Sequence, residues 1–227
     1  VNHIVNLANA TIIKRFHELN IKGQIGPSFA FPVLYALDNR PENVLATEQS
    51  LDVNVWYWMD AYILGRYPKT ALAYLKNQFG IELDIREGDF DILKSGRPDF
   101  VGVNYYQSHT FAANVPNAEA GEPDQFKHVK NEHLERTSWE WEIDPTGLRI
   151  ALRRITSRYD IPIMITENGL GEYDSLTEDR EVHDSYRIEY LENHITAVQN
   201  AIEDGCEVLG YCTWSFTDLL SWLNGYG

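Results

Sequence analysis

The stretch Ile163–Met164–Ile165–Thr166–Glu167–Asn168–Gly169 places a carboxylate directly after an apolar run and before a turn. The run is short and partly β-branched, which is typical of a strand in a parallel sheet that is covered on both faces. Asn-Gly then favours a turn. In a barrel of parallel strands this end faces the active site, so Glu167 is a candidate catalytic residue. A solvated carboxylate beside an ordinary turn is the local alternative.

Other runs of the same kind lie on either side of this stretch, at Gln24–Phe31, Phe100–Tyr106 and Val208–Phe216. Helical spacing predicts helices at Ile4–Leu19, Leu51–Leu64, Pro145–Arg158 and His183–Asp204. The alternation predicts an α/β fold with parallel strands joined by right-handed crossovers. We therefore expect half of a (β/α)8 TIM barrel, with a small self-contained α/β sandwich as the alternative.

Length and composition favour one globular unit. The chain has 227 residues, 44% of them hydrophobic, and contains no internal repeat or Gly/Ser linker at which to cut a second domain. An open four-stranded sheet would leave two raw edges that need covering. We therefore expect residues 1–227 to be a single catalytic domain that is incomplete.

The charge balance narrows the kinds of partner. With 19 basic and 34 acidic residues, the net charge of −15 disfavours nucleic acid and anionic membranes. Val1–Ala10 lacks the pattern of a secretory signal, and no apolar run approaches a membrane span of about 20 residues. Cys206 and Cys212 are interpreted as buried thiols in a reducing, cytoplasmic compartment. The seven histidines show no metal-ligand spacing, so no metal is expected.

Polar and aromatic residues follow two other predicted strands. Asn104 and Tyr106 come at the end of one, and Trp214 follows another. If the strands line one barrel, these side chains converge near Glu167. A tyrosine hydroxyl can hold a carboxylate, Asn can bind a sugar hydroxyl, and Trp can stack on a pyranose ring. Ordinary core packing is the alternative for each of them taken alone.

Three segments together resemble glycoside hydrolase family 1, namely Ile165–Gly169, Gly102–Tyr106 and Trp214–Asp218. The resemblance covers essentially the whole chain. It extends, in the same order, to Leu64–Pro68, Trp141, Asp144–Pro145 and Gly147–Leu148. Each segment alone is weak evidence for the family, but all of them in this order are strong evidence.

This resemblance implies a retaining mechanism without a cofactor, in which one carboxylate attacks the anomeric carbon and a second protonates the leaving oxygen. Glu167 matches the nucleophile, Tyr106 the tyrosine that orients it, Asn104 a residue near the sugar, and Trp214 a wall of the sugar site. The acid/base glutamate of the family lies in an Asn-Glu-Pro motif at the end of strand four, which this sequence lacks. The chain is therefore expected to be the C-terminal half, strands five to eight, with the missing N-terminal half as its partner.

Ser221 narrows the expected substrate. Family glucosidases place a glutamate before the last tryptophan of this region, whereas here Ser221 precedes Trp222. The change resembles the 6-phospho-β-glycosidase branch, since it removes a charge that would repel a phosphate. Neutral drift in a loop is the alternative, and the Lys-x-Tyr that pairs with this serine is not present before Gly227. By the same resemblance, Trp222 after this serine favours a pocket that also accepts galactosides.

We therefore expect a hydrolase for a small phosphorylated disaccharide or β-glycoside, either a 6-phospho-β-glucoside or a 6-phospho-β-galactoside. A β-glucosidase for unphosphorylated glycosides is the first alternative. A non-catalytic half-barrel that binds sugar or serves in assembly is the second.

Overall fold

A four-stranded parallel sheet forms the centre of the computed structural model, which describes residues 1–113, 128–217 and 220. Its order is β1-β3-β6-β7, with bounds Ser28–Ala30, Val101–Tyr105, Ile163–Asn168 and Val208–Thr213. Each neighbouring pair is parallel. The four predicted strands are thus confirmed, although the first is much shorter than Gln24–Phe31.

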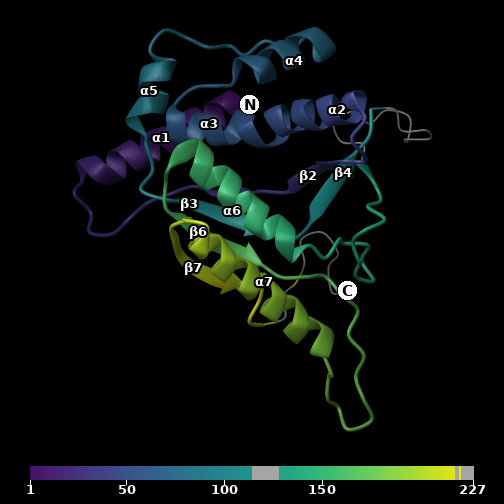
Figure 1. The fold of residues 1–227 in the computed structure, drawn as a ribbon. Coiled ribbons are helices and arrows are strands. Elements are labelled where there is room, and N and C mark those ends of the chain that lie inside the picture. Colours follow the sequence, from purple (N-terminus) through teal and green to yellow (C-terminus); the bar gives the residue numbers. More distant parts are fainter. Residues whose placement is uncertain (114–127, 218–219, 221–227) are drawn as a thin grey trace.

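The helices gather around this sheet (Figure 1). They are α1 (Asn2–Glu18), α2 (Pro41–Leu51), the π-helical turn η1 (Asp52–Trp56), α3 (Tyr57–Leu64), α4 (Lys69–Phe79), α5 (Asp89–Ser95), α6 (Pro145–Tyr159) and α7 (Ser185–Glu203). The four predicted helices are confirmed, and one of them begins earlier, at Pro41. The sequence interpretation missed α4 and α5.

Two predicted helix ends follow from simple backbone chemistry. Asp144 precedes α6, and its side chain accepts a hydrogen bond from the backbone N of Gly147 at 2.8 Å. Pro145 then occupies the first helical turn, where its missing N–H costs nothing. Gly205 follows α7 with a φ of 97°, a conformation that favours glycine.

The larger core cluster lies between the sheet and the helices, among them α3, α6 and α7. Val103 and Ile165 point to this side and are fully buried against Leu148 and Leu152. The opposite side of the strands, which carries Thr166, is only partly buried. The expectation of strands covered on both faces is therefore met only in part by the described residues. Helices cover one face, while the interior face, which side chains from eight strands fill in a complete barrel, is lined here by four.

A second, three-stranded sheet was not predicted. It contains β2 (Val33–Ala36), β4 (Ser108–Phe111) and β5 (His128–Val129) in the order β2-β4-β5. β2 pairs parallel with β4, and β4 pairs antiparallel with β5. Its strands β4 and β5 lie in the long segment between β3 and α6, whereas β2 precedes α2.

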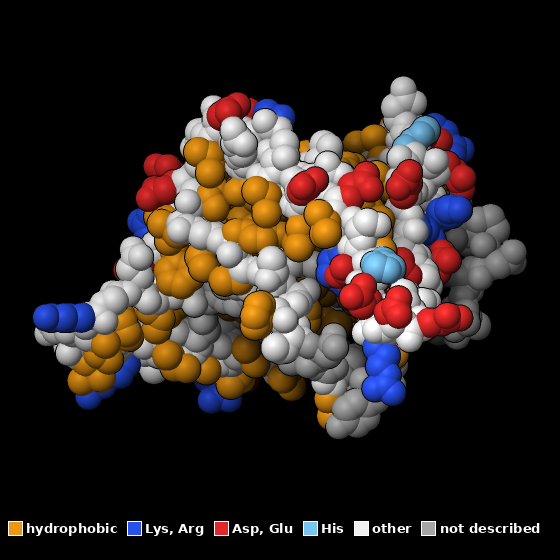
Figure 2. Space-filling view, turned by 90° about the horizontal axis from the view of Figure 1, so that it is seen from below, with side chains coloured by type: hydrophobic (Ala, Val, Ile, Leu, Met, Phe, Trp, Pro, Cys, Tyr) orange, Lys and Arg blue, Asp and Glu red, His pale blue; other side chains and the backbone are white. Residues whose placement is uncertain are grey.

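The open side of the molecule carries exposed apolar residues. β1 and β7 are the two edges of the four-stranded sheet among the described strands. On α7, a stripe of Ile188, Ile195 and Ile202 is at least half exposed, and Leu209 lies on β7 nearby in sequence. Figure 2, seen from below, shows hydrophobic side chains across the left and centre of this surface and acidic ones to the right.

Two smaller expectations come out differently. Cys206 is buried as predicted, but Cys212 is exposed because it lies on the edge strand β7, so its prediction as a buried thiol is wrong. Across the described parts of the chain, no helix has both the length and the apolar character needed to cross a membrane.

Candidate active site

Glu167 lies on a β-bulge at the C-terminal end of β6. On the β3 side, Val103 faces Ile165 while the next residue, Asn104, faces Glu167, so one residue of β6 is extra. On the β7 side the register shifts as well, between Ile165 and Asn168. A bulge bends its strand and turns a side chain to a new direction. The local backbone therefore sets where the Glu167 carboxylate points.

Tyr106 bonds directly to this carboxylate. Its hydroxyl donates to Oε2 of Glu167. Burial, and then this hydrogen bond, raises the pKa of Tyr106 well above its ordinary value. Tyr106 therefore stays protonated at physiological pH and remains a donor to Glu167. Its ring packs edge-to-face on Trp141, with centroids 5.5 Å apart.

Asn104 is held on the interior face beside Glu167. Its Oδ1 accepts from the hydroxyl of Ser28 at 2.9 Å and from the hydroxyl of Thr166 at 2.6 Å. Because both bonds use the oxygen, the orientation of the side-chain amide is fixed and its two N–H donors lie on the other branch. Such a donor suits the hydroxyl of a sugar.

Trp214 follows β7 at the same end of the sheet. Its backbone N donates to the carbonyl of Asn168 at 2.8 Å, and its side chain is 49% exposed. A Cβ at Gly169 would lie 2.0 Å from the Trp214 carbonyl oxygen, so only glycine allows the two segments to approach. An exposed indole at this position offers a flat surface on which a pyranose can stack.

The structure thus brings Glu167, Tyr106, Asn104 and Trp214 to the ends of three adjacent strands, as the sequence predicted. Their roles stay predictions. Ser221 and Trp222 lie outside the described residues.

An aromatic row extends from Tyr106 away from the carboxylate. Trp141 contacts Trp139 with ring centroids 5.7 Å apart, and Trp139 contacts Tyr173 at 6.0 Å. The row borders the candidate site, and it is also packed by its own rings.

Asn168 is a structural residue that the sequence interpretation missed, since it was taken only for part of a turn. It is fully buried, and its Nδ2 donates to the carbonyl of Tyr105 at 2.7 Å and to the hydroxyl of Tyr190 at 3.1 Å. The hydroxyl of Tyr211 donates to its Oδ1. Asn168 therefore ties β3, β7 and α7 together immediately behind Glu167. The available signal was the i, i+4 pair of Tyr190 and His194 on the buried side of α7.

His194 belongs to the same cluster. Its side chain is fully buried. Its ring stacks on Tyr190 with centroids 3.8 Å apart, and its Nδ1 donates to the Tyr190 carbonyl at 2.8 Å. Burial lowers the pKa of His194 to about 4, so the ring is neutral near pH 7. No group of three metal-binding side chains occurs among the residues that the structure describes.

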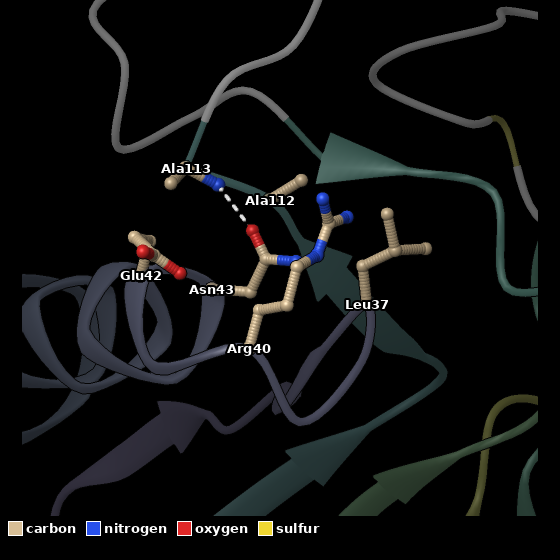
Figure 3. Close-up of a pocket in the computed structure, with 6 residues that line it drawn as sticks. All are labelled: Leu37, Arg40, Glu42, Asn43, Ala112 and Ala113. Atoms are coloured by element: carbon tan, nitrogen blue, oxygen red, sulfur yellow. Dashed lines mark hydrogen bonds between the residues drawn. The ribbon is translucent and has the colours of Figure 1, made fainter.

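A separate pocket of about 300 Å³ lies at the start of α2 (Figure 3). It is lined by Leu37, Arg40, Glu42, Asn43, Ala112 and Ala113. Its polar groups bond locally, since the Ala113 backbone N donates to Asn43 Oδ1 at 2.9 Å and Arg40 pairs with Asp38 at 2.8 Å. It shares no lining residue with the Glu167 cluster, so it is not part of that site.

Comparison with known proteins gives matches that cover the whole chain or nearly all of it. A family model described as "Glycosyl hydrolase family 1" matches residues 1–227. The aryl-phospho-beta-D-glucosidase BglC of Bacillus subtilis is 49% identical over 99% of this chain and 50% of its own length. A 6-phospho-beta-galactosidase of Leptotrichia buccalis is 35% identical over 99% of this chain and 52% of its own length. The chain spans about half the length of these relatives.

Solved structures agree on the fold. A beta-glucosidase from Exiguobacterium marinum superposes with a TM-score of 0.85 at 27% identity, covering 99% of this chain and 50% of that one. A family 1 b-glucosidase from Thermotoga maritima gives 0.83 at 29% identity, covering 99% and 49%. The predicted fold class, half of a (β/α)8 barrel, is confirmed.

Proposed function

Because the chain belongs to glycosyl hydrolase family 1, we propose that it is the nucleophile-bearing half of a retaining glycosidase for 6-phospho-β-glucosides or 6-phospho-β-galactosides. The observation that carries this proposal is the geometry at Glu167. A strand delivers the carboxylate to the active end of the half-barrel, a bulge turns it, and the Tyr106 hydroxyl holds it.

In the proposed reaction Glu167 attacks the anomeric carbon and the aglycone leaves with a proton from a second carboxylic acid. Retaining enzymes place the two carboxyl groups about 5 to 5.5 Å apart. That acid lies outside this chain. Water then hydrolyses the glycosyl ester and restores Glu167. Asn104 binds a sugar hydroxyl and Trp214 stacks on the ring, and no cofactor takes part.

Two facts support the phosphorylated substrate. Relatives whose names specify phosphorylated glycosides reach 49% identity. By resemblance, Ser221 stands where plain glucosidases carry a glutamate, and a neutral donor there would not repel a phosphate as a carboxylate would; Trp222 follows it in the sequence. The competing function is hydrolysis of plain β-glucosides, which is favoured by the similarity to the beta-glucosidases of Exiguobacterium marinum and Thermotoga maritima.

We also propose that residues 1–227 form one incomplete catalytic domain whose partner is a second (β/α)4 half-barrel. The edges β1 and β7 each need a parallel strand, and the Ile188, Ile195 and Ile202 stripe needs a covering helix. A reducing, cytoplasmic compartment fits the two free thiols, Cys206 and Cys212.

The test is to complete the barrel and compare substrates. This chain is joined to the part of BglC from Bacillus subtilis that it does not cover, and turnover is measured on aryl β-glucosides and β-galactosides with and without a 6-phosphate. We expect turnover of the phosphorylated compounds, with a much higher kcat/KM than for the plain ones. Equal kcat/KM would favour the plain β-glucosidase.

The control is the same chimera with Glu167→Gln, which separates turnover by this site from a contaminating enzyme. A folded chimera that binds sugar but turns over none of the four substrates would support the non-catalytic half-barrel instead.

A further inference from the structure

Tyr190 of α7 lies behind the candidate site. We propose that it is a positioning residue for the nucleophile Glu167, an inference that rests on the proposed function. Its hydroxyl donates to the backbone carbonyl of Tyr106 at 3.2 Å and accepts from Nδ2 of Asn168 at 3.1 Å. Tyr106 bonds to the carboxylate of Glu167, and Asn168 is the next residue after it. One hydroxyl therefore joins the two backbone segments that aim the nucleophile.

The position of Tyr190 is itself fixed. Its side chain is only 3% exposed, and the His194 ring stacks on it with an interplanar angle of 23°. Burial raises the pKa of Tyr190 well above its ordinary value, so its hydroxyl keeps its proton at physiological pH and remains a donor. α7 thus presents a rigid donor to the strand ends.

The contacts give Tyr106 two anchors on opposite sides. Its side chain holds Glu167, while its carbonyl is held by Tyr190. Tyr106 lies just past the end of β3, beyond the last residue pair between β3 and β6, which is Tyr105 with Asn168. Loss of the Tyr190 hydroxyl would free this carbonyl and let the Tyr106 ring drift with the carboxylate. Small misplacements of reacting groups lower rates strongly, even when binding is unaffected.

The first experiment separates positioning from binding. In the barrel completed with the BglC part, Tyr190→Phe is treated with an activated 2-deoxy-2-fluoro-6-phospho-β-glucoside, which traps the glycosyl ester. We expect the inactivation rate constant to fall by about threefold to tenfold, the range of one lost hydrogen bond, with the inhibitor concentration for half-maximal rate unchanged. An inactivation rate constant equal to that of the parent would overturn the proposal.

Tyr159→Phe is the matched control. Tyr159 is also buried, at 6% exposure, and its hydroxyl also makes a hydrogen bond, to Asp60 at 2.6 Å, but it lies on α6 away from the site. This variant should lose thermal stability and keep the labelling kinetics. If it slows labelling as much as Tyr190→Phe does, the effect is one of stability and the positioning role is wrong.

A double-mutant cycle tests whether Tyr190 acts through Tyr106. Tyr106→Phe, Tyr190→Phe and the double variant are compared by the same inactivation rate constant. Residues that act as one unit give losses that do not add. We expect Tyr190→Phe to have less than about a twofold further effect once the Tyr106 hydroxyl is gone. Fully multiplicative losses would contradict the proposed route.

A third measurement needs no glycosidase activity. Amide hydrogen exchange in residues 1–227 reports local opening. Tyr190→Phe should speed exchange in the peptides that cover 101–106 and 163–169, whereas Tyr159→Phe should not. Unchanged exchange there would overturn the proposal. If the completed parent barrel is never labelled, the proposed function fails, and this exchange experiment still decides whether Tyr190 holds the strand ends.

Discussion

A carboxylate attacks a sugar efficiently only when it is held at the right angle, and three neighbours hold Glu167. The bulge in β6 turns it, the Tyr106 hydroxyl bonds it, and Asn168 behind it fixes the backbone. All three are supplied by the chain itself, so its own fold sets the direction of the Glu167 carboxylate.

Glu167→Gln tests the nucleophile by changing one atom of the side chain. In the completed barrel we expect turnover to fall by several orders of magnitude, because an amide cannot form the glycosyl ester. Steady-state kinetics measure the loss, and circular dichroism checks that the fold survives. Near-normal turnover in this variant would remove Glu167 from the role.

Ser221 should matter only for phosphorylated substrates. Ser221→Ala removes a donor to the phosphate and should raise KM for a 6-phosphoglycoside, with weak hydrolysis of the plain glycoside unchanged. Ser221→Glu places like charge beside the phosphate and should raise KM further. The measurement is kcat/KM on both substrates for each variant, and equal effects on both would contradict the phosphate assignment.

At the scale of elements, α7 serves two sides of the molecule. Tyr190 and His194 face the sheet and are buried, while Ile188 and Ile195 point outwards and are exposed. Helix periodicity alone predicted where α7 lies, but it could not show which apolar residues face the sheet, because both sides of this helix carry them.

The buried side of α7 makes stability depend on pH. The pKa of His194 is about 4 in the folded chain, below its ordinary value of about 6.5. As pH falls through this window the unfolded chain binds a proton that the folded chain does not, so the free energy of unfolding falls. At pH 4 the lowered pKa of His194 reduces the free energy of unfolding by about 3 kcal/mol relative to its value above pH 7. Above pH 7 His194 adds no further pH dependence.

His194→Phe keeps the stacked ring and removes the titration. Urea unfolding at pH 7 and pH 4.5 should therefore show a smaller loss of stability on acidification in this variant than in the parent. His183→Phe, at an exposed position, is the control and should behave like the parent. Identical pH dependence in His194→Phe and the parent would show that His194 is not buried as a neutral ring.

The strands and long helices were predictable from sequence because period and capping are local signals. Asp144 with Pro145, and Gly205 after α7, set helix ends through contacts within four residues. The bulge at Glu167 and the bonds from Asn168 to Tyr105 and Tyr190 were not predictable, because they depend on residues 22 and more positions away. That these site residues lie close together could be seen only once the arrangement of the strands was known.

The second sheet shows the same limit. β4 is only four residues long and contains Ser108 and His109, so its composition does not stand out as a strand. Its pairing with β2 joins segments about 75 residues apart, Val33 to Ser108. Long-range pairing of this kind leaves little trace in local sequence pattern.

On the scale of the whole molecule, the described strands leave the four-stranded sheet with two open edges, and α7 carries an exposed apolar stripe, as expected for half of a barrel. Ile195→Glu places a charge in the centre of that stripe, where a covering helix would bury it. We expect at least about a tenfold weaker association with the BglC part supplied as a separate chain, since an unpaired buried charge is costly. Sedimentation or calorimetry measures it.

Thr196→Glu adds the same charge to an exposed position of α7 about 100° around the helix from Ile195 and serves as the control. It should associate as the parent does. Equal binding by the Ile195→Glu and Thr196→Glu variants would mean that the stripe is not the contact surface for the other half.

The central claim, that this chain supplies the nucleophile and depends on another half for the acid, is tested most directly by covalent labelling of separate halves. Purified 1–227 is incubated with an activated 2-deoxy-2-fluoro-6-phospho-β-glucoside, alone and with the BglC part, then digested and weighed. We predict a mass increment on the peptide that contains Glu167 when both halves are present, and no turnover of an activated 6-phospho-β-glycoside by 1–227 alone. An adduct on another residue, or robust turnover by the isolated chain, would contradict the account.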